Sequence, residues 1–299
     1  MCMSEAVAAV IATFNPDSGI LRTVDSLVKQ NVRVVVVDDA STLDSVAEIL
    51  NECARRGVNV IRKATNSGIG HSLNTGMDWA RGIGAEYLLT LDQDTYLPQD
   101  YVSSCLRVNC EVGAMGIKVG LVTAGKMNGR LRAPRRPIEG TSYYTAIDPM
   151  QSGSLVPMGA AEAVGGFREE FVMDCVDVDF CLKLRRAGFA AIWNDDCEVQ
   201  HELGKMTPIK VGSVGIVWRG RPLEVSNHSD TRRYYMTRNR LVLLREFSSI
   251  DPEWASKARR AYARESLRAL VFERKRVRRI GTMFEALQDA FRYRLGRRL

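Results

Sequence analysis

Short runs of consecutive apolar residues alternate with stretches of helical periodicity over the first 95 or so residues of the chain. The apolar runs at 5–14, 32–37, 58–61 and 87–91 are typical of strands buried on both faces of a parallel sheet. Between these runs, apolar residues recur three or four positions apart, which predicts amphipathic helices. Four such alternations joined by short loops predict a doubly wound α/β fold with a mostly parallel sheet flanked by helices.

Polar residues directly follow the first three predicted strands. Thr13 and Asn15 follow the first strand, Asp39 the second, and Asn66 the third. The carboxyl ends of parallel strands meet at one edge of an open sheet, where ligands of such folds bind. Turn residues are common at strand ends in any α/β protein. Polar residues nevertheless follow every predicted strand, and two of these sets carry two acids each, Asp38 with Asp39 and Asp92 with Asp94. This pattern favours a site that contacts the base and ribose of a nucleotide.

The fourth predicted strand ends in Asp92 and Asp94, one residue apart, within the segment LDQDT. An unpaired carboxylate is costly to bury, so neither residue is expected inside the core. Two carboxylates at this edge can bind a divalent cation that in turn binds phosphate oxygens. The alternative is an Asp-rich turn without a metal, because Asp is a common turn former.

The hydrophobic periodicity weakens between residues 113 and 144. Segments 125–130 and 133–137 combine glycine, proline and basic residues, and we expect a mobile basic loop there. This composition is equally compatible with a lid that closes over an anionic donor substrate and with an ordinary solvent-exposed loop.

A second acidic segment carries Asp174, Asp177 and Asp179, just before helical periodicity that ends at Gly188. We expect all three carboxylates at the start of a helix, where the helix dipole favours negative charge. Capping explains one or two of them, whereas a third suggests a general base for an acceptor hydroxyl. A last strand then ends in His201, which is either an ordinary satisfied histidine or the imidazole ligand that completes an Asp-bound metal.

The overall composition is that of a globular protein, with 299 residues, 45% hydrophobic and 26% charged. No apolar run approaches the roughly 18–20 residues that span a bilayer. The N-terminus lacks the basic region of a secretory signal, and the seven cysteines show no CxxC pairing. These features predict a protein of the cytoplasm, a reducing compartment.

Positive charge is concentrated at the C-terminal end. Residues 255–299 contain 14 Lys and Arg against four Asp and Glu, so this segment carries about +10 while the whole chain carries +7. A basic tail on a near-neutral body indicates an anionic partner. Its apolar residues at helical spacing are compatible with a basic amphipathic helix on the inner face of the cell membrane. A helix packed on the catalytic domain and a contact in a homo-oligomer are equally compatible.

Several motifs together resemble family 2 inverting glycosyltransferases with the GT-A fold, and within that family the bacterial rhamnosyltransferases of cell-surface polysaccharide assembly. The resemblance runs from about residue 7 to residue 247 and rests on these segments: ATFNPD, VVVVDDAS, NSGIGHSLNTG, LDQDT, SGSLVP, GGFREEF with the following DCVDVDFCLKLRRAGF, VQHELG and YYMTRNRLVLL. It implies a GT-A domain over residues 1–247, followed by a basic helical extension over residues 248–299.

The resemblance also implies roles for individual residues. The nucleotide base and ribose would contact Thr13, Asn15, Asp39, Asn66 and Asp92. Mn²⁺ or Mg²⁺ would be bound by Asp94 and His201, with Asp92 as a further ligand.

The general base would be Asp177, with Asp174 and Asp179 as support or alternatives. Many relatives have adjacent Glu-Asp where this chain has Asp-Cys-Val-Asp, which leaves the choice between Asp174 and Asp177 open. The donor implied is dTDP-rhamnose, and the acceptor is a glycan or lipid-linked hydroxyl. Another nucleotide sugar, such as UDP-galactofuranose, is the nearest alternative.

Three further hypotheses fit the residues less well. A nucleotidyltransferase would carry a Gly-rich basic loop after the first strand, where this chain has the short acidic Asn-Pro-Asp-Ser-Gly. A nucleic-acid-binding protein would show interleaved aromatics or a recognised binding motif in the basic tail, and we expect no nucleic acid partner. A catalytically silent scaffold would not need the acidic set.

Overall fold

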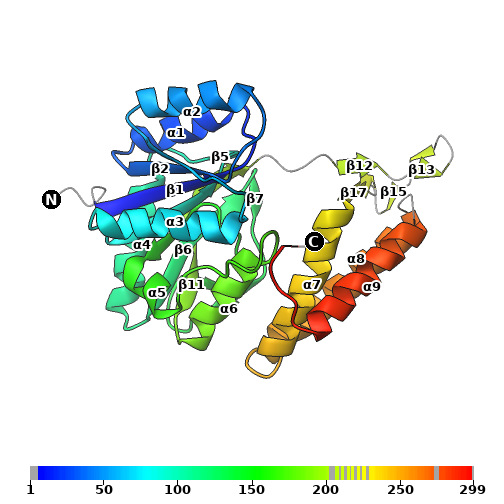
Figure 1. Ribbon diagram of the computed structural model, residues 1–299. Helices are drawn as coiled ribbons and strands as arrows, with labels where there is room; N and C mark the ends of the chain where they lie inside the picture. Colours follow the sequence, from blue (N-terminus) through cyan, green and yellow to red (C-terminus); the bar gives the residue numbers. More distant parts are fainter. Residues whose placement is uncertain are drawn as a thin grey trace. The chain divides into compact units, whose positions relative to one another are not determined.

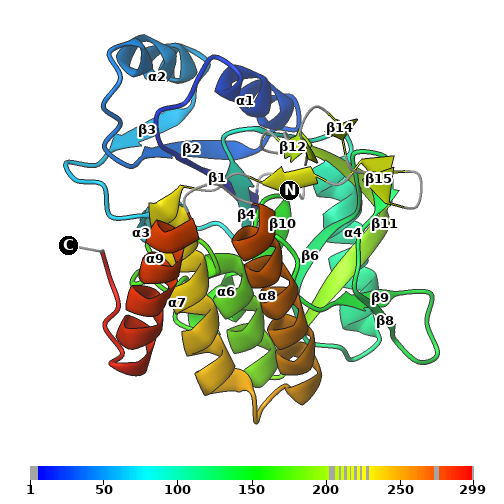
Figure 2. The ribbon, with the colours of Figure 1, turned by 90° about the vertical axis from the view of Figure 1, so that its right-hand side faces the viewer.

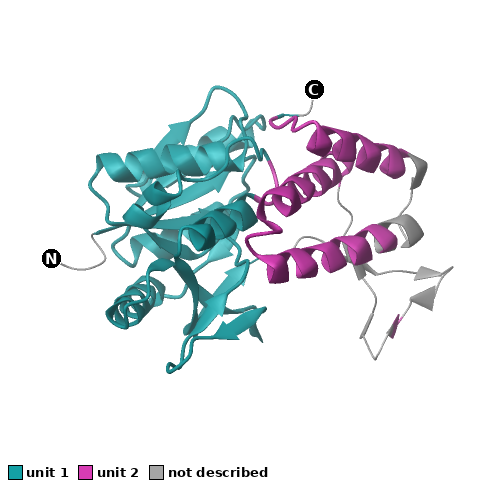
Figure 3. Cartoon of the chain, turned by 90° about the horizontal axis from the view of Figure 1, so that it is seen from below, with its two compact units in different colours: residues 1–172, 176–201, 297–299 teal, residues 173–175, 202–296 magenta. Residues whose placement is uncertain are grey.

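The computed structural model describes residues 6–201 continuously and then residues 206–208, 210–211, 214–215, 217–218, 221–222, 224–226, 229–272 and 276–297. Three parts of the sequence-based predictions lie outside the described residues. They are residues 1–5, where the first predicted strand begins, residues 202–204 of the VQHELG motif, and Glu273 of the basic tail. The chain divides into two compact units (Figure 3). Unit 1 holds residues 1–172, 176–201 and 297–299, and unit 2 holds residues 173–175 and 202–296.

Strands and helices alternate along unit 1 (Figure 1). In chain order they are β1 (Val7–Thr13), α1 (Ile20–Val28), β2 (Arg33–Asp38), α2 (Ser45–Arg55), β3 (Asn59–Arg62), α3 (Ile69–Gly82), β4 (Tyr87–Asp92), β5 (Thr95–Tyr96), α4 (Tyr101–Ala114), β6 (Val119–Met127), β7 (Arg130–Leu131), β8 (Arg135–Pro137), β9 (Tyr144–Ala146), β10 (Ser154–Pro157), α5 (Met158–Ala163), α6 (Val176–Arg186) and β11 (Ala190–His201).

These strands form one sheet in the order β3-β2-β1-β4-β10-β6-β11-β9-β8, with β5 paired to β11 and β7 paired to β6. The first four neighbours, β3, β2, β1 and β4, run parallel to one another, as the sequence predicts. β10 runs antiparallel between β4 and β6, and β11 runs parallel to β6. The predicted α/β class with a mostly parallel sheet is confirmed, and the antiparallel strand β10 is the main addition to it.

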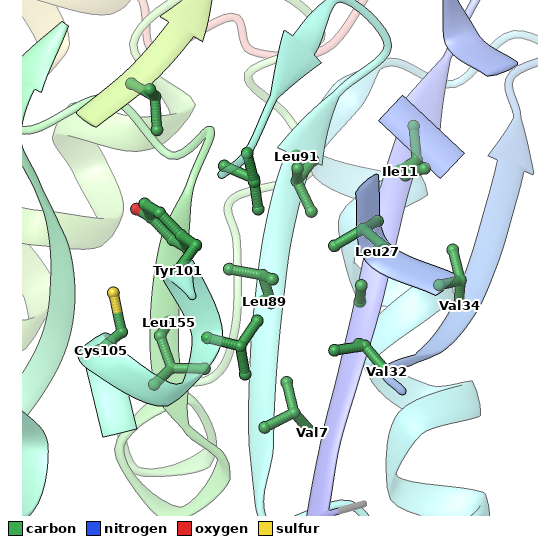
Figure 4. Close-up of a cluster of buried hydrophobic side chains, with 14 of the residues drawn as sticks. Val7, Ile11, Leu27, Val32, Val34, Leu89, Leu91, Tyr101, Cys105 and Leu155 are labelled. Carbon is green, nitrogen blue, oxygen red and sulfur yellow. The ribbon is translucent and has the colours of Figure 1, made fainter. Parts of the chain in front are cut away.

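The centre of this sheet is apolar on both faces, which explains why its strands are continuous hydrophobic runs in the sequence. Val7 and Ile11 of β1 face a buried cluster that α1, α2 and α4 complete, and Figure 4 shows Ile11 near Leu27 of α1 and Val7 near Val32. On the opposite face, α3 packs directly against β1. A Cβ atom added at Gly76 of α3 would lie only 2.2 Å from Val10 Cγ1.

The basic loop expected at residues 125–130 begins inside a strand, so that part of the expectation is wrong. The strand is β6, a nine-residue strand in the middle of the sheet. Two glycines concealed it, because a Cβ on Gly120 would lie 2.8 Å from Phe189 Cβ and one on Gly125 would lie 3.0 Å from the carbonyl oxygen of Asn194. A strand glycine that permits such close approach cannot be distinguished from a loop glycine in one sequence.

The main body of unit 2, within the described residues, consists of α7 (Asp230–Phe247), α8 (Pro252–Phe272) and α9 (Arg276–Phe291), and α7 packs against both other helices (Figure 2). Short strands precede them and pair as β12 (Met206–Pro208) with β17 (Glu224–Ser226), β13 (Lys210–Val211) with β14 (Val214–Gly215), and β15 (Val217–Trp218) with β16 (Arg221–Pro222). Compact packing therefore groups α7 with the basic helices, whereas we placed the boundary after residue 247. None of the helices in the described part of the chain is long and apolar enough to cross a bilayer.

Candidate active site

Asp92, Asp94 and His201 come together at the carboxyl edge of the sheet in unit 1. Asp92 ends β4, His201 ends β11, and β5 brings them together because Thr95 of β5 pairs in register with His201. Each of the three side chains offers one ligand atom, and these atoms lie within 4.8 Å of one another. His201 Nδ1 is 3.4 Å from Asp94 Oδ1. Residues more than 100 positions apart thus form one cluster, as the metal hypothesis requires.

The cluster has the donor set and the accessibility of a divalent cation site. Two carboxylates and an imidazole suit a borderline-hard ion better than a soft one. The Asp94 side chain is 40% exposed and that of His201 is 16% exposed. Solvent therefore reaches the cluster from one side, where the phosphates of a ligand would complete the coordination of an ion.

A chain of hydrogen bonds behind the cluster orients its members. The Gln151 side chain donates from Nε2 to Asp92 Oδ1, and the Asp92 backbone N–H donates to Ser152 Oγ at 2.9 Å. Ser152 Oγ lies 2.6 Å from Thr95 Oγ1, which lies 2.9 Å from His201 Nδ1. Hydrogen-bonded partners of this kind fix the ring of a metal-binding histidine and the rotamer of a metal-binding carboxylate.

The turn between β6 and β7 holds His201 from the other side. Asn128 accepts a hydrogen bond from the His201 backbone N–H at 3.1 Å and donates one to the His201 carbonyl at 2.8 Å. This turn belongs to the segment that the sequence analysis interpreted as a basic loop. The sequence gives no signal for the role of Asn128, because an Asn-Gly pair is an ordinary turn dipeptide.

The loops after β1 and β4 are joined through the side chain of Gln93, the middle residue of the Asp-x-Asp segment. Gln93 Oε1 accepts hydrogen bonds from Thr13 Oγ1 at 2.6 Å and from the Phe14 N–H at 3.0 Å. Thr23 Oγ1 donates to the Gln93 carbonyl at 3.1 Å. Thr13 is thereby held beside the acidic segment, and Gln93 is a positioning residue that the sequence analysis missed.

Asn15 joins the loops after β1 and β2. Its Oδ1 accepts hydrogen bonds from the backbone N–H groups of Thr42 at 2.8 Å and Leu43 at 3.2 Å. Its own N–H donates to Ser41 Oγ at 2.7 Å. Asn15 adopts φ 49°, a left-handed conformation that Asn tolerates better than most residues. The side chain thus organises the edge on which a nucleotide base would lie.

Asp39 is 5% exposed and its carboxylate accepts three hydrogen bonds from groups of the chain. It pairs with Lys63 Nζ at 2.6 Å and accepts from the backbone N–H groups of Ser67 at 2.9 Å and Gly68 at 2.8 Å. Asp39 therefore holds the loop that follows β3. Asn66, the fourth predicted nucleotide contact, lies in that loop, half-buried.

Close packing requires glycine at position 68. Gly68 adopts φ 94°, and a Cβ there would lie 2.4 Å from the Val172 carbonyl oxygen, which accepts a hydrogen bond from the Ile69 N–H at 3.2 Å. On the other side of the same loop, the Asn66 carbonyl accepts from Arg297 Nη1 at 2.8 Å. The predicted nucleotide residues Thr13, Asn15, Asp39 and Asn66 thus lie on loops that follow β1, β2 and β3 at one edge of the sheet.

The three acids of the second acidic segment occupy different environments. Only Asp177 and Asp179 lie in the first turn of α6. Asp174 lies before the helix at φ 59°, so the expectation that all three stand at the helix start is wrong for Asp174. The left-handed backbone at Asp174 and at Cys175, which has φ 64°, separates Asp174 from the other two acids.

Asp179 is wholly buried and paired with two cations. Its carboxylate lies 3.1 Å from Arg168 Nε and 3.6 Å from Lys183 Nζ. Lys183 Nζ also donates to the Gly166 carbonyl at 2.6 Å, and burial lowers the pKa of Lys183 despite the nearby carboxylate. This arrangement fixes the Gly-Gly turn to α6 and leaves Asp179 no access to an acceptor.

Asp174 belongs to unit 2, where α7 holds it. Arg232 donates to its carboxylate from Nε at 3.2 Å and from Nη2 at 3.0 Å. The buried Asn239 donates to the carbonyls of Met173 and Asp174, each at 2.9 Å. These bonds offset the cost of the left-handed backbone, which is on the order of 1–3 kcal/mol. Asp174 is a loop anchor in this geometry.

Asp177 is half-buried at the start of α6, and its Oδ1 accepts from the Val178 N–H at 2.8 Å. Burial raises the pKa of the Cys181 thiol, one turn further on, and the charge of Asp177 raises it further. Cys181 Sγ lies 3.8 Å from the Pro149 carbonyl, and the same loop continues to Gln151, which bonds Asp92. Contacts thus connect the start of α6 with the loop that orients Asp92.

Comparisons with known proteins agree with this geometry. The sequence model of Glycosyl transferase family 2 matches residues 8–169, more than half of the chain. The dTDP-rhamnosyl transferase RfbF of Shigella flexneri is 28% identical over 261 residues, which cover 82% of this chain and 81% of that protein.

Among solved structures, the S. aureus TarS fragment 1–349 in complex with UDP-GlcNAc is similar with a TM-score of 0.54 and 16% identity, covering 96% of this chain and 73% of the fragment. Of a longer TarS chain, the matched region spans 43%. The mannosyltransferase PcManGT of Pyrobaculum calidifontis, in complex with GDP-Man and Mn²⁺, is similar with a TM-score of 0.53, 17% identity and coverage of 96% of this chain and 75% of its own. These likenesses show the GT-A fold, and the match over residues 8–169 shows that the chain is a glycosyltransferase that belongs to glycosyl transferase family 2.

Proposed function

We propose that this glycosyltransferase transfers L-rhamnose from dTDP-rhamnose to a hydroxyl group of a glycan or lipid-linked acceptor, with inversion at the anomeric carbon. The main support for a nucleotide-sugar donor is the cluster of Asp92, Asp94 and His201. The ligand atoms of these residues lie within 4.8 Å of one another at the carboxyl edge of the sheet. The rhamnosyl group is supported by the relative in Shigella flexneri, which matches along most of both chains.

Asp94 and His201, with Asp92 beside them, are the residues that would hold Mn²⁺ or Mg²⁺. An ion bound there supplies charge neutralisation for the diphosphate that leaves with the nucleotide. The imidazole in the donor set favours Mn²⁺, because Mg²⁺ is bound almost entirely by oxygen ligands. The crystallised mannosyltransferase relative contains Mn²⁺.

The nucleotide would lie along the loops after β1, β2 and β3. Thr13, Asn15 and Asn66 are the residues we assign to contact the base and ribose, with Asp92 at the ribose end. Asp39 is also assigned to this site, and it holds the loop after β3 through its bonds with Lys63, Ser67 and Gly68.

Asp177 is the residue we assign as general base. Of the three acids, Asp174 is bonded by Arg232 and Asp179 is buried between Arg168 and Lys183. Asp177 lies in the first turn of α6 and is half-buried, and it is the position that the resemblance to the family assigns to the base. It would accept the proton of the acceptor hydroxyl while that oxygen attacks the anomeric carbon from the face opposite the diphosphate. A single displacement of this kind inverts the configuration.

The cytoplasm is the compartment that fits this assignment. The described cysteines Cys53, Cys105, Cys110, Cys175, Cys181 and Cys197 form no disulfide bonds with one another, as expected in a reducing environment.

A donor screen tests the proposal. The melting temperature of the protein is measured with dTDP-rhamnose, UDP-galactofuranose and UDP-GlcNAc, each with Mn²⁺ and again with EDTA. Saturation at about 100 times the Kd stabilises the folded state by about 2.7 kcal/mol, which raises the melting temperature measurably. We expect dTDP-rhamnose with Mn²⁺ to give the largest rise, and EDTA to reduce it.

If only UDP-galactofuranose stabilised the protein, that nucleotide sugar would be the donor and rhamnosyl transfer would be refuted. The same stabilisation by every donor in EDTA would refute the metal-dependent donor site.

A further inference from the structure

Helix α9 exposes a continuous stripe of large apolar side chains. Ile280 is 53% exposed, Phe284 59%, Leu287 37% and Phe291 76%. Their spacings of four, three and four residues place them on one side of the helix, because an α-helix turns about 100° per residue. A water-facing helix surface normally carries charged or polar side chains at these positions.

The opposite side of α9 is buried and consists of small residues. Thr282 is 5% exposed, Ala286 0% and Ala290 5%. This side packs on α7, where Tyr234 donates a hydrogen bond to Asp289 at 2.7 Å. The helix therefore turns its small residues inward and its large apolar residues outward. The described residues of unit 2 leave this outer stripe uncovered, and exposed apolar patches of this kind mark interaction surfaces.

The charge around the stripe identifies the kind of surface. Residues 255–299 carry 14 Lys and Arg against four acids. Arg292 and Arg294 are exposed just beyond the last turn of α9, whereas Arg278 in its first turn pairs with Asp230 of α7 at 2.8 Å. An apolar stripe with exposed arginines at its C-terminal end, in a strongly basic segment, matches a bilayer with anionic headgroups.

A second copy of this chain fits the stripe less well. A twofold dimer would place the same patch of each copy opposite itself. The basic segments that carry α9 would then come together, and like charges in apposition oppose association. An anionic lipid surface satisfies both the apolar and the basic components without that repulsion.

We propose that the outer face of α9, defined by Ile280, Phe284, Leu287 and Phe291, docks unit 2 on an anionic phospholipid surface. The aromatic rings enter the boundary between headgroups and acyl chains, and the arginines contact lipid phosphates. The helix lies in the plane of the interface and does not cross the bilayer. This inference is independent of the donor sugar, because no residue of the metal cluster takes part in it.

Vesicle flotation of the full-length protein tests this surface. The vesicles contain phosphatidylcholine alone or phosphatidylcholine with phosphatidylglycerol. We expect the wild type to float with the anionic vesicles only, and high salt to release it, because salt screens the arginine–phosphate attraction.

Two variants remove the two components separately. Phe284→Ser with Phe291→Ser should lower the fraction bound by about tenfold or more, since burying one such ring contributes more than a factor of ten. Arg292→Glu with Arg294→Glu should cause a similar loss, since each basic residue near an anionic surface contributes about fivefold. Both pairs are exposed, so circular dichroism and the melting temperature should stay at wild-type values.

A matched control carries Val28→Ser with Met115→Ser, which are also exposed apolar residues at 40% and 51% but lie in unit 1. This variant should float like the wild type. Equal flotation of the Phe284→Ser/Phe291→Ser variant would overturn the proposal, as would failure of the wild type to bind anionic vesicles. A concentration-dependent dimer that is lost in the same variant, without vesicle binding, would assign the stripe to a second copy and also overturn it.

Discussion

Two acidic segments of this chain look alike in sequence and differ in structure. Asp92 and Asp94 lie with His201 in one cluster whose partners come from β5, β11 and the loop before β10. Asp174, Asp177 and Asp179, although closer in sequence to one another than to any histidine, are separated: one is bonded by α7, one is buried with two cations, and one stands at the start of α6.

The difference follows from the backbone that carries each segment. A parallel sheet brings the ends of its strands to one edge, so distant residues meet there. Around the start of a helix, successive side chains point to different sides. The side chains of residues 174, 177 and 179 therefore point in different directions. Spacing alone therefore predicts a shared site for strand-end acids better than for acids around a helix start.

Asp177→Asn is the substitution with the largest expected effect. It distinguishes the proposed catalytic role of Asp177 from the structural roles of Asp174 and Asp179. Loss of a positioned general base costs about 10²–10⁴-fold in turnover. Donor binding should persist, since no donor-binding residue changes. Turnover and the donor Kd, measured on the same preparation, check this. Turnover within threefold of wild type would remove Asp177 from the role.

Asp179→Asn tests whether the buried acid is structural. Removing one partner from a buried ion pair costs about 3–5 kcal/mol in unfolding free energy, because Arg168 and Lys183 would remain buried without their counter-charge. Urea denaturation measures the change. A variant with wild-type stability but no turnover would instead assign catalysis to Asp179 and break the distinction between the acids.

Thr95→Val tests the hydrogen bonds behind the metal cluster. The substitution preserves the size of the side chain and removes the hydroxyl that lies 2.9 Å from His201 Nδ1. Losing such a partner of a metal ligand weakens metal affinity by about 10–100-fold. Activity titrated against Mn²⁺ should shift to higher concentration and recover at saturation. An unchanged Mn²⁺ requirement would show that Thr95 does not orient His201.

Asp174→Asn should have the smallest effect of the four. Its partner Arg232 has a side chain that is 50% exposed, and exposed ion pairs contribute about 0–1 kcal/mol. Asn can also adopt the left-handed backbone at this position. We expect turnover within about threefold of wild type. A loss comparable to that of Asp177→Asn would restore Asp174 as the alternative base.

Much of the fold was predictable from the sequence, because β1, β2 and β4 are mainly apolar runs with polar residues at their ends, and the shorter β3 carries two apolar residues at its centre. β6 was missed since its glycines serve close packing against Phe189 and Asn194, a reason that only the tertiary structure reveals. Helix α4 was not identified either.

The ligands of the candidate site were predictable, whereas the residues that orient them were not. Asp92, Asp94 and His201 are residue types with metal chemistry. Gln151, Ser152 and Asn128 are ordinary turn and loop residues, and only their contacts with Asp92 and His201 distinguish them. The acids at 174, 177 and 179 were predicted as a set, and the structure gives each a different environment.

The central claim is that Asp94 and His201, from two distant strands, bind one divalent cation that holds the donor diphosphate. Electron paramagnetic resonance of free Mn²⁺, titrated in the presence of dTDP, measures this directly in the wild type, in Asp94→Asn and in His201→Gln. We expect one bound Mn²⁺ per wild-type chain and a marked loss of Mn²⁺ affinity in each variant. One tightly bound Mn²⁺ per chain with unchanged affinity in both variants would contradict it.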